Sequence, residues 1–399
     1  MRWLALIVMG SASTSSYANL YIQPNLTTSF GYNVSEHYAT EQRVELATKL
    51  EFSTENIDFT FDGRVEHDFV YNNNDRFSID AQDQYESRAI IEEAYISGEI
   101  SNRFWSFGYQ KVVWGEADDL RVVDVINPLD YKDFIFFDID DYRLAVPMFK
   151  LDYEYENGDT LNIITTFQQL SNEYPAPRAE FGNNYYPNSE QTQWGKYELG
   201  LRYSTFALAT DVSLYAFHGY QDDPVVTLSP SERTLYSYEK FSMLGTSLSK
   251  PIDAFVLRSE FAYFDNYTVN DSDLSFKNVN KLEALIGLDY RYKDWTTTLQ
   301  FTDRILNGWQ PSYLIPKSAP IYTASAERGF FANQLYIRAA VSYLDNQGGG
   351  ALSQLKLTYK PSQQWVLKLN LDLIEGDQEN YLGAQQQRDR IWLAATYYF

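Results

Sequence analysis

Apolar and polar side chains alternate along most of the chain. They do so in segments of about ten residues, the length of a strand that crosses a bilayer. Because successive side chains of a β-strand point to opposite faces, each segment has one apolar face and one charged face. The period of two recurs over 44–52, 57–66, 149–156, 197–204, 282–291 and 365–373. This pattern predicts an all-β protein.

The number of such segments favours a membrane barrel over a secreted soluble β-sandwich. In lipid, an open sheet edge would leave unpaired amides that cost several kcal/mol each, so the sheet must close. The connections also fall into two classes, as in outer-membrane barrels. Short turns are expected at 53–56, 101–102, 157–159, 250–253 and 293–294, and long loops at 71–85, 170–196, 219–238, 266–279, 307–331 and 376–389. We therefore predict a transmembrane antiparallel β-barrel of roughly 16–18 strands.

The clearly alternating segments add up to an odd number, although both termini of a bacterial barrel should lie on the periplasmic side. Either two segments merge into one strand, or a further strand lies within 313–324 despite Pro316 and Pro320. No internal repeat and no domain boundary is visible, so residues 19–399 are expected to form one barrel.

One stretch interrupts the alternation. A strand-like run ends at Trp114, Gly115 follows, and the period of two resumes only at Phe149. Within the stretch, Asn127-Pro128-Leu129-Asp130 predicts a turn, because proline fixes φ and the flanking Asn and Asp favour turn geometry. We expect residues 114–147 to be an insertion folded into or over the lumen, where it acts as a constriction or plug. Trp114 and Gly115 would form its hinge, and Asn127, Pro128 and Asp130 would fix its return.

The insertion is rich in acidic and aromatic residues. Its carboxylates suggest a charged constriction or a cation site, for which Asp138, Asp140 and Asp141 are the candidate oxygen ligands. They equally fit a solvated face neutralised by nearby Lys and Arg, and no EF-hand spacing is present. The apolar cluster of Phe134, Ile135, Phe136, Phe137 and Ile139 would contact a hydrophobic substrate or a partner, or would anchor the insertion to the barrel wall. The candidate pore and insertion residues are Gln110, Trp114, Gly115, Glu116, Asp118, Asp119, Asn127, Pro128, Asp130, Phe134, Phe136 and Phe137.

The two ends of the chain carry export signals. Arg2, an apolar run over 3–9 and Ser16-Tyr17-Ala18 predict a signal peptide over residues 1–18, with Asn19 as the first mature residue. The final strand ends in Phe399, with an aromatic residue two positions earlier. This ending resembles the signal by which the outer-membrane assembly machinery selects its barrel clients. The location that follows is the bacterial outer membrane, with its lipid and lipopolysaccharide as surroundings.

Composition narrows the function further. Aromatic residues make up 17% of the chain, including 33 Tyr, which membrane interfaces favour. The chain has no cysteine, so disulfides, zinc-thiolate sites and cysteine nucleophiles are excluded. A net charge of -22 argues against nucleic acid as a partner. The inward-facing charges are mixed in sign, which would give a transverse field across a pore or a wall stiffened by cross-strand ion pairs.

No enzyme signature accompanies these features. The only histidines, His37, His67 and His218, lie in separate segments, and neither a G-x-S-x-G nor an H-E-x-x-H frame surrounds them. We predict no cofactor and no catalytic role. An outer-membrane hydrolase built around a residue such as His67 is the least favoured alternative.

A family resemblance enters at the insertion. Gly108-Tyr109-Gln110, then Val113-Trp114-Gly115-Glu116, then the turn at 127–130 resemble the motif of the proteobacterial outer-membrane barrels known as domain of unknown function 1302. That resemblance implies an outer-membrane conduit for a hydrophobic or amphipathic molecule, with periplasmic components and an inner-membrane exporter of the resistance-nodulation-division type as partners. The alternative is a general diffusion porin for small hydrophilic solutes.

Overall fold

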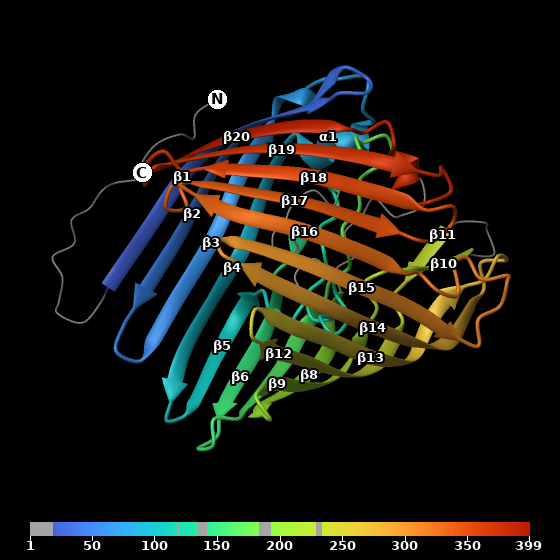
Figure 1. The fold of residues 1–399 in the computed structure, drawn as a ribbon. Coiled ribbons are helices and arrows are strands. Elements are labelled where there is room, and N and C mark those ends of the chain that lie inside the picture. Colours follow the sequence, from blue (N-terminus) through green and yellow to red (C-terminus); the bar gives the residue numbers. More distant parts are fainter. Residues whose placement is uncertain (1–18, 118–119, 135–141, 183–192, 229–233) are drawn as a thin grey trace.

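The alternating segments form a closed barrel, seen from the side in Figure 1. The computed structural model describes residues 19–117, 120–134, 142–182, 193–228 and 234–399. Its main sheet has 18 antiparallel strands. It closes because β1 (Asn19–Asn33) pairs with β2 (Tyr38–Ser53) on one side and with β20 (Arg390–Tyr398) on the other. The wall therefore has no free edge, as a strand protein in lipid requires.

The remaining barrel strands follow one another around the wall in chain order. They are β3 (Ile57–Asp68), β4 (Ser87–Ile100), β5 (Arg103–Gln110), β6 (Val146–Glu154), β7 (Thr160–Gln169), β8 (Gln193–Ala207), β9 (Thr210–Tyr220), β12 (Lys240–Ile252), β13 (Phe255–Asn270), β14 (Phe276–Tyr292), β15 (Trp295–Asn307), β16 (Ile321–Phe330), β17 (Leu335–Leu344), β18 (Gly350–Tyr359) and β19 (Trp365–Gly376). A separate hairpin, β10 (Val225–Leu228) and β11 (Thr234–Ser237), stands between β9 and β12. The helical pieces are α1 (Ile79–Tyr85) and the 3-10 turns Phe69–Tyr71 and Gly383–Gln385.

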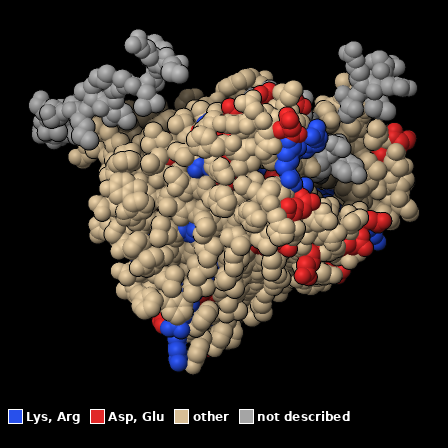
Figure 2. All heavy atoms as spheres, turned by 90° about the horizontal axis from the view of Figure 1, so that it is seen from above, with Lys and Arg blue, Asp and Glu red and all other residues tan. Residues whose placement is uncertain are grey.

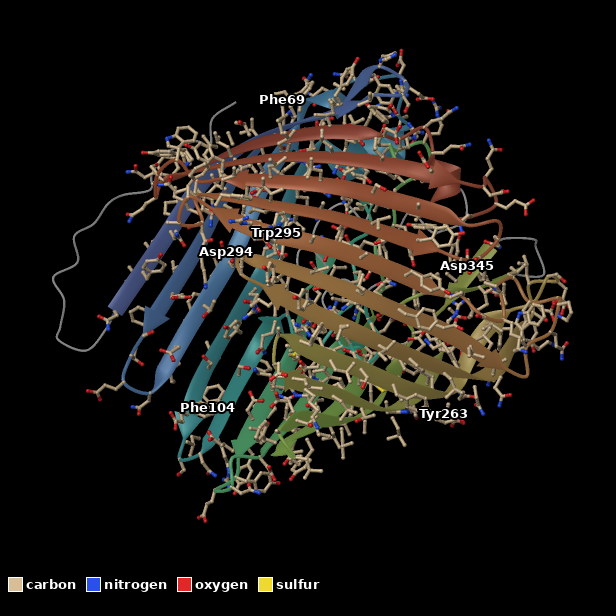
Figure 3. The ribbon with its side chains drawn as sticks, viewed as in Figure 1. Phe69, Phe104, Tyr263, Asp294, Trp295 and Asp345 are labelled. Carbon is tan, nitrogen blue, oxygen red and sulfur yellow. The ribbon has the colours of Figure 1, made fainter. Side chains whose placement is uncertain are left out.

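Burial is inverted relative to a soluble protein. On β14, outward-facing Ile286 is 54% exposed, whereas inward-facing Asp289 is only 8% exposed. Figure 2 shows a broad flank with few charged side chains. Exposed aromatic side chains also gather near the short turns, among them Phe104 and Trp295 in Figure 3. An apolar outer face with an aromatic girdle is what hydrocarbon and its interface select.

None of the helices in the described ranges is long and apolar enough to cross a membrane.

In the described ranges the barrel has 18 strands, within the predicted 16–18. The strand missing from the clear segments was predicted within 313–324, and the observed strand overlaps only the end of that range. It is β16, which begins at Ile321. Pro316 and Pro320 precede it, so neither proline removes a donor from the ladder.

The predicted long loop at 266–279 is wrong. β13 and β14 run through this region and pair as far as Asn270 and Phe276. The register shifts between Phe264 and Tyr267, because a bulge adds a residue to β13 there. The bulge breaks the period of two, which is why the sequence looked like a loop.

The connections place the insertion at the long-loop end of the barrel. Short turns join β2 to β3, β4 to β5, β6 to β7 and β14 to β15, as predicted. Asn19 and Phe399 lie at this same short-turn end. The insertion leaves β5 and returns to β6 at the opposite end, together with the loops that carry α1 and the β10–β11 hairpin.

Candidate functional site

Asn127 fastens the two limbs of the insertion to each other. Its side chain is fully buried, and its amide nitrogen donates to the carbonyl oxygens of Gln110 (3.0 Å) and Leu144 (2.7 Å). Its Oδ1 accepts from the Val112 amide at 2.8 Å. Pro128 adds a contact, since its carbonyl accepts from the Leu144 amide at 2.9 Å. One asparagine thus closes the neck where the chain leaves and re-enters the wall.

Gln110, the last residue of β5, is 4% exposed and supports this neck from the wall. Its amide nitrogen donates to the Met148 carbonyl at 3.2 Å, and its side-chain oxygen accepts from Ser106. The polar end of the strand is therefore satisfied inside the barrel, where an unpaired amide would be costly.

The middle of the insertion is packed into the lumen by apolar contacts. Trp114, Val123 and Ile126 are at most 2% exposed and belong to one core with the inward side chains of β6, β7, β9 and β12–β14. The wall makes room with glycine: a Cβ atom at Gly200 would lie 2.8 Å from Trp114 Cη2. This side of the lumen is therefore filled with side chains.

A buried ion cluster holds the return limb. The Asp133 carboxylate lies 3.1 Å from Arg43 of β2 and 3.1 Å from Arg88 of β4. Burial opposes its ionisation, but these two guanidinium groups hold the pKa of Asp133 well below its ordinary value. Asp130 contacts Lys132 at 3.3 Å, and burial nonetheless raises the Asp130 pKa. The acidic residues described here are thus bound to cations of the wall and of the insertion itself.

Phe134 packs among the outer loops. It is 1% exposed and stacks on Phe181 and Tyr381, with ring centroids 5.0 and 5.5 Å away. It shares a small core with Leu352 of β18 and with Ile374, Leu382 and Phe181. In this position Phe134 anchors the insertion to its surroundings.

Several candidate residues lie outside the described residues: Asp118, Asp119, Phe136, Phe137, Asp138, Asp140 and Asp141. The candidate cation site over 138–141 is therefore among them. In the described ranges, no group of three or more His, Asp or Glu side chains is arranged to hold a metal ion.

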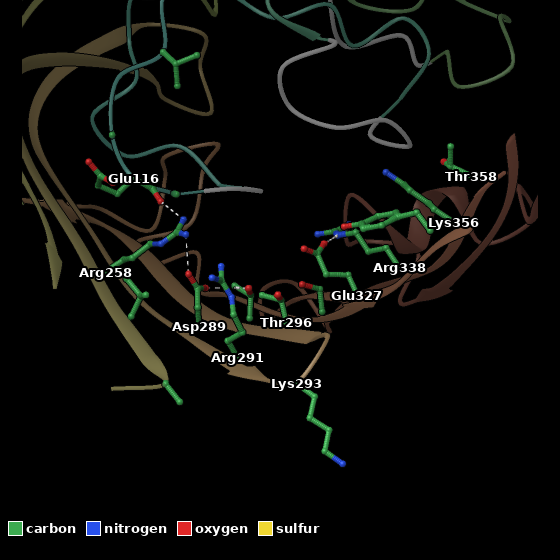
Figure 4. Close-up of a pocket in the computed structure, with 18 of the residues that line it drawn as sticks. Glu116, Arg258, Asp289, Arg291, Lys293, Thr296, Glu327, Arg338, Lys356 and Thr358 are labelled. Carbon is green, nitrogen blue, oxygen red and sulfur yellow. Dashed lines mark hydrogen bonds and ion pairs between the residues drawn. The ribbon is translucent and has the colours of Figure 1, made fainter. Parts of the chain in front are cut away.

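Two cavities lie between the insertion and the part of the barrel wall opposite the apolar core. The outer cavity, about 460 Å³, reaches Tyr174 and Tyr381 of the long loops. The inner cavity, about 930 Å³, reaches Asp253 and Lys293 at the short turns. Arg338 of β17 and Lys356 of β18 line both cavities. Figure 4 shows them facing the space across from Glu116 and Arg258.

A third cavity, of about 500 Å³, lies beneath the insertion on the β1–β4 side. Carboxylates outnumber cations in its lining by eight to four, whereas cations outnumber carboxylates by six to four in the inner cavity. Much of the acidic wall is internally paired. Glu66, for example, lies within ion-pair distance of Arg43, Arg64 and Arg88. The inner end of the lumen therefore has a basic side and an acidic side.

The sequence motif identified the insertion, but Arg258 of β13 and Lys356 of β18 were not among the predicted site residues. Both side chains point into the lumen from their strands. The sequence could have indicated this, because each residue is adjacent to an apolar, outward-facing leucine, Leu257 or Leu357. Around Arg258 this signal was weak, because the outward position on its other side is Ser259.

A closed barrel with an apolar exterior, a charged lumen and a loop folded into that lumen defines an outer-membrane β-barrel protein. The chain belongs to the family described as "Protein of unknown function (DUF1302)", whose model matches residues 27–309. The resemblance at the insertion motif is thereby confirmed. No curated protein matches the chain.

Solved structures share the fold over nearly the whole chain. Pseudomonas aeruginosa OpdK with vanillate has 12% identity and a TM-score of 0.57, over 96% of this chain and 98% of its own. Acinetobacter baumannii OccAB4 has 11% identity and a TM-score of 0.58, over 96% and 99%. Pseudomonas aeruginosa OccK3 (OpdO) has 12% identity and a TM-score of 0.59, over 96% of each chain. OpdK is described as an outer membrane protein. The closed barrel with its apolar outer face places the chain described here in the bacterial outer membrane.

Proposed function

We propose that the protein is a passive channel for small hydrophilic solutes. One observation carries this proposal: the outer and inner cavities both border Arg338 and Lys356, and together their linings extend from the long loops to the short turns. Passage would run between the insertion and the β15–β18 wall, past charged and hydroxyl side chains. Selection in such a route depends on width, hydrogen bonding and charge, without covalent chemistry.

The charge distribution favours solutes that carry an anionic group. Arg338 and Lys356 stand where the two cavities meet, and Arg121 lines the outer one. Guanidinium groups suit carboxylates because their donors form a planar fork. Tyr131 and Tyr174 line the same outer cavity and stack on each other with centroids 5.6 Å apart. The OpdK structure holds vanillate, an aromatic carboxylate, which supports this substrate chemistry for a barrel of the same fold.

A conduit for hydrophobic or amphipathic molecules is the second candidate. The observation in its favour is the apolar part of the outer cavity, which includes Leu120, Leu129 and Leu352. The inner cavity offers no comparable surface, since its lining consists mainly of charged residues, Thr and Ser. The hydrophilic route therefore fits the described residues better, and an inner-membrane export partner stays a prediction.

The third candidate, a hydrolase, gains no support from the histidines. His67 Nδ1 pairs with Ser87 Oγ at 2.8 Å, and His218 Nδ1 pairs with Ser242 Oγ at 2.9 Å. Both histidines occupy outward positions of their strands, across from exposed Val44 and Leu199. These side chains face away from the lumen.

Liposome swelling tests the proposed function. Vesicles carrying the refolded protein should swell in isotonic sugars and amino acids, at rates that fall steeply as solute size increases. Small monocarboxylates should enter faster than uncharged solutes of equal size. Vesicles that stay as tight as protein-free ones toward every hydrophilic solute would contradict the proposal.

A further inference from the structure

We infer that Glu260 of β13 is the positioning residue that fixes the insertion against the wall and so sets the width of the constriction. The inference rests on the proposed channel function for its effect on conduction. Its structural part, the anchoring of residues 116, 117 and 123, can be tested separately. Glu260 is 3% exposed and points into the lumen.

A single carboxylate serves three backbone donors of the insertion. Glu260 Oε1 accepts from the amides of Glu116 (2.5 Å) and Ala117 (2.9 Å). Its Oε2 accepts from the Val123 amide at 3.3 Å. An ionised carboxylate accepts hydrogen bonds at both oxygens. A glutamine has only one acceptor oxygen, so its NH2 group would face either the amides of Glu116 and Ala117 or the amide of Val123. The charge of Glu260 is therefore needed, as well as its shape.

The backbone at Gly115 is adapted to this carboxylate. Gly115 has φ +92, and a Cβ atom there would lie 2.5 Å from Glu260 Oε1. A side chain at this position would meet the carboxylate in addition to adopting a disfavoured conformation. The Gly115 amide also donates to the Tyr215 hydroxyl at 3.2 Å. A glycine at position 115 thus allows the insertion backbone to approach the Glu260 carboxylate of the wall closely.

Arg258 reinforces the same contact from two residues earlier on β13. Its Nη1 donates to the Glu116 carbonyl at 2.7 Å, and its Nη2 lies 2.7 Å from Asp289 of β14. Figure 4 shows the chain of contacts from Glu116 through Arg258 to Asp289. The peptide units at 115–117 are held on their N–H side by Glu260 and on their carbonyl side by Arg258.

The held segment borders the proposed route. Gly115, Glu116 and Ala117 line the inner cavity, and Leu120 and Arg121 line the outer one. The apolar core contacts the Val123 and Ile126 side chains, but these contacts do not fix the direction of the peptide groups at residues 116, 117 and 123, whose amides donate to Glu260. Releasing Glu260 should therefore leave Ile126 packed inside the barrel, while residues 115–117 move between positions of different pore width and Val123 becomes transiently exposed.

Single-channel recording in planar bilayers provides the first test, with Glu260→Gln compared with Glu283→Gln. Glu283 is a matched control, because it faces the lumen from the neighbouring strand, pairs with Lys281 at 3.0 Å and loses the same charge. The wild type and E283Q should show one steady open level. E260Q should show a larger mean conductance with flicker between levels. Gly115→Ala should give the same flicker, because it displaces the Glu260 carboxylate without changing the charge of the wall.

Cysteine labelling provides a test that does not depend on conduction. The chain has no cysteine, and Val123 is 0% exposed, so Val123→Cys reports release of the insertion. In folded protein, verified by its heat-modifiable migration on gels, the maleimide rate of V123C should rise about tenfold or more in the E260Q or G115A background, the effect of losing one charge-assisted hydrogen bond. It should not rise in the E283Q background. Unchanged labelling and a steady single level in both E260Q and G115A would overturn the role of Glu260. A silent wild type would overturn the channel proposal, while the labelling result would still decide the anchoring.

Discussion

Replacing Asp133 by Asn should loosen the return limb of the insertion while leaving the barrel intact. Asp133 bridges Arg43 and Arg88, whose side chains are 11% and 7% exposed. Removing one partner of a buried ion pair costs about 3–5 kcal/mol, because the remaining charge stays desolvated. Here both arginines keep Glu66 as a second partner. We therefore expect a smaller loss, of roughly 2–4 kcal/mol in local stability.

Hydrogen exchange followed by mass spectrometry measures this loss where it occurs. The amides of Asp130, Tyr131 and Phe134 are bonded to the Tyr142, Glu173 and Tyr131 carbonyls, at 2.7 to 2.9 Å. A loss of that size accelerates their exchange by about two orders of magnitude, whereas strand peptides keep their protection. Asp152→Asn is the control, because its ion pair with Lys150 is about one-third exposed and contributes little. Equal exchange in D133N and the wild type would refute the anchoring role of Asp133.

The same ion cluster predicts a pH dependence. The pKa of Asp133 is depressed below its ordinary 3.8, so its stabilisation is present above that value and is lost as the pH falls toward the folded-state pKa. The Asp133 contribution to the protection of residues 130–134 should be constant from pH 7 to pH 5 and decline below about pH 4, where the unfolded carboxyl binds its proton. In D133N this contribution to the pH dependence should vanish.

Three further predictions follow from the route, the packing and the chain end. Arg338→Gln combined with Lys356→Gln should shift the reversal potential toward cation preference in a salt gradient, and an unchanged potential would place the route elsewhere. Gly200→Ala should lower the free energy of unfolding in lipid by about 1–3 kcal/mol, because its Cβ would overlap Trp114. Urea titration of the refolded barrel measures this loss, and an unchanged free energy of unfolding would contradict the prediction. Deleting Phe399 should reduce assembly in cells yet leave refolding into detergent intact, and normal surface levels would contradict its role as an assembly signal.

The sequence predicted the barrel well because alternation is a local property. A strand such as β19 carries its inward and outward faces within residues 365–376, and lipid imposes the same rule on every strand. The prediction failed where the local rule is broken, as at the bulge between Phe264 and Tyr267. There an added residue changes the face of every following side chain.

The sequence predicted where the insertion lies along the chain, but it did not predict which residues of the wall and of the other loops contact it. The motif around Asn127 marked the insertion, yet the partners of Phe134 come from Phe181 and Tyr381 in two other loops. Glu260 likewise meets Glu116 across more than a third of the chain. No local period encodes such pairings, since they depend on which wall positions the closed barrel brings opposite the insertion.

Conductance of the full-length refolded protein in a planar bilayer tests the channel proposal most directly. The predicted result is steady, ohmic openings with the insertion in place. A membrane that stays silent until residues 115–146 are deleted would contradict the account, because the insertion would then be a plug across the lumen instead of one wall of an open passage.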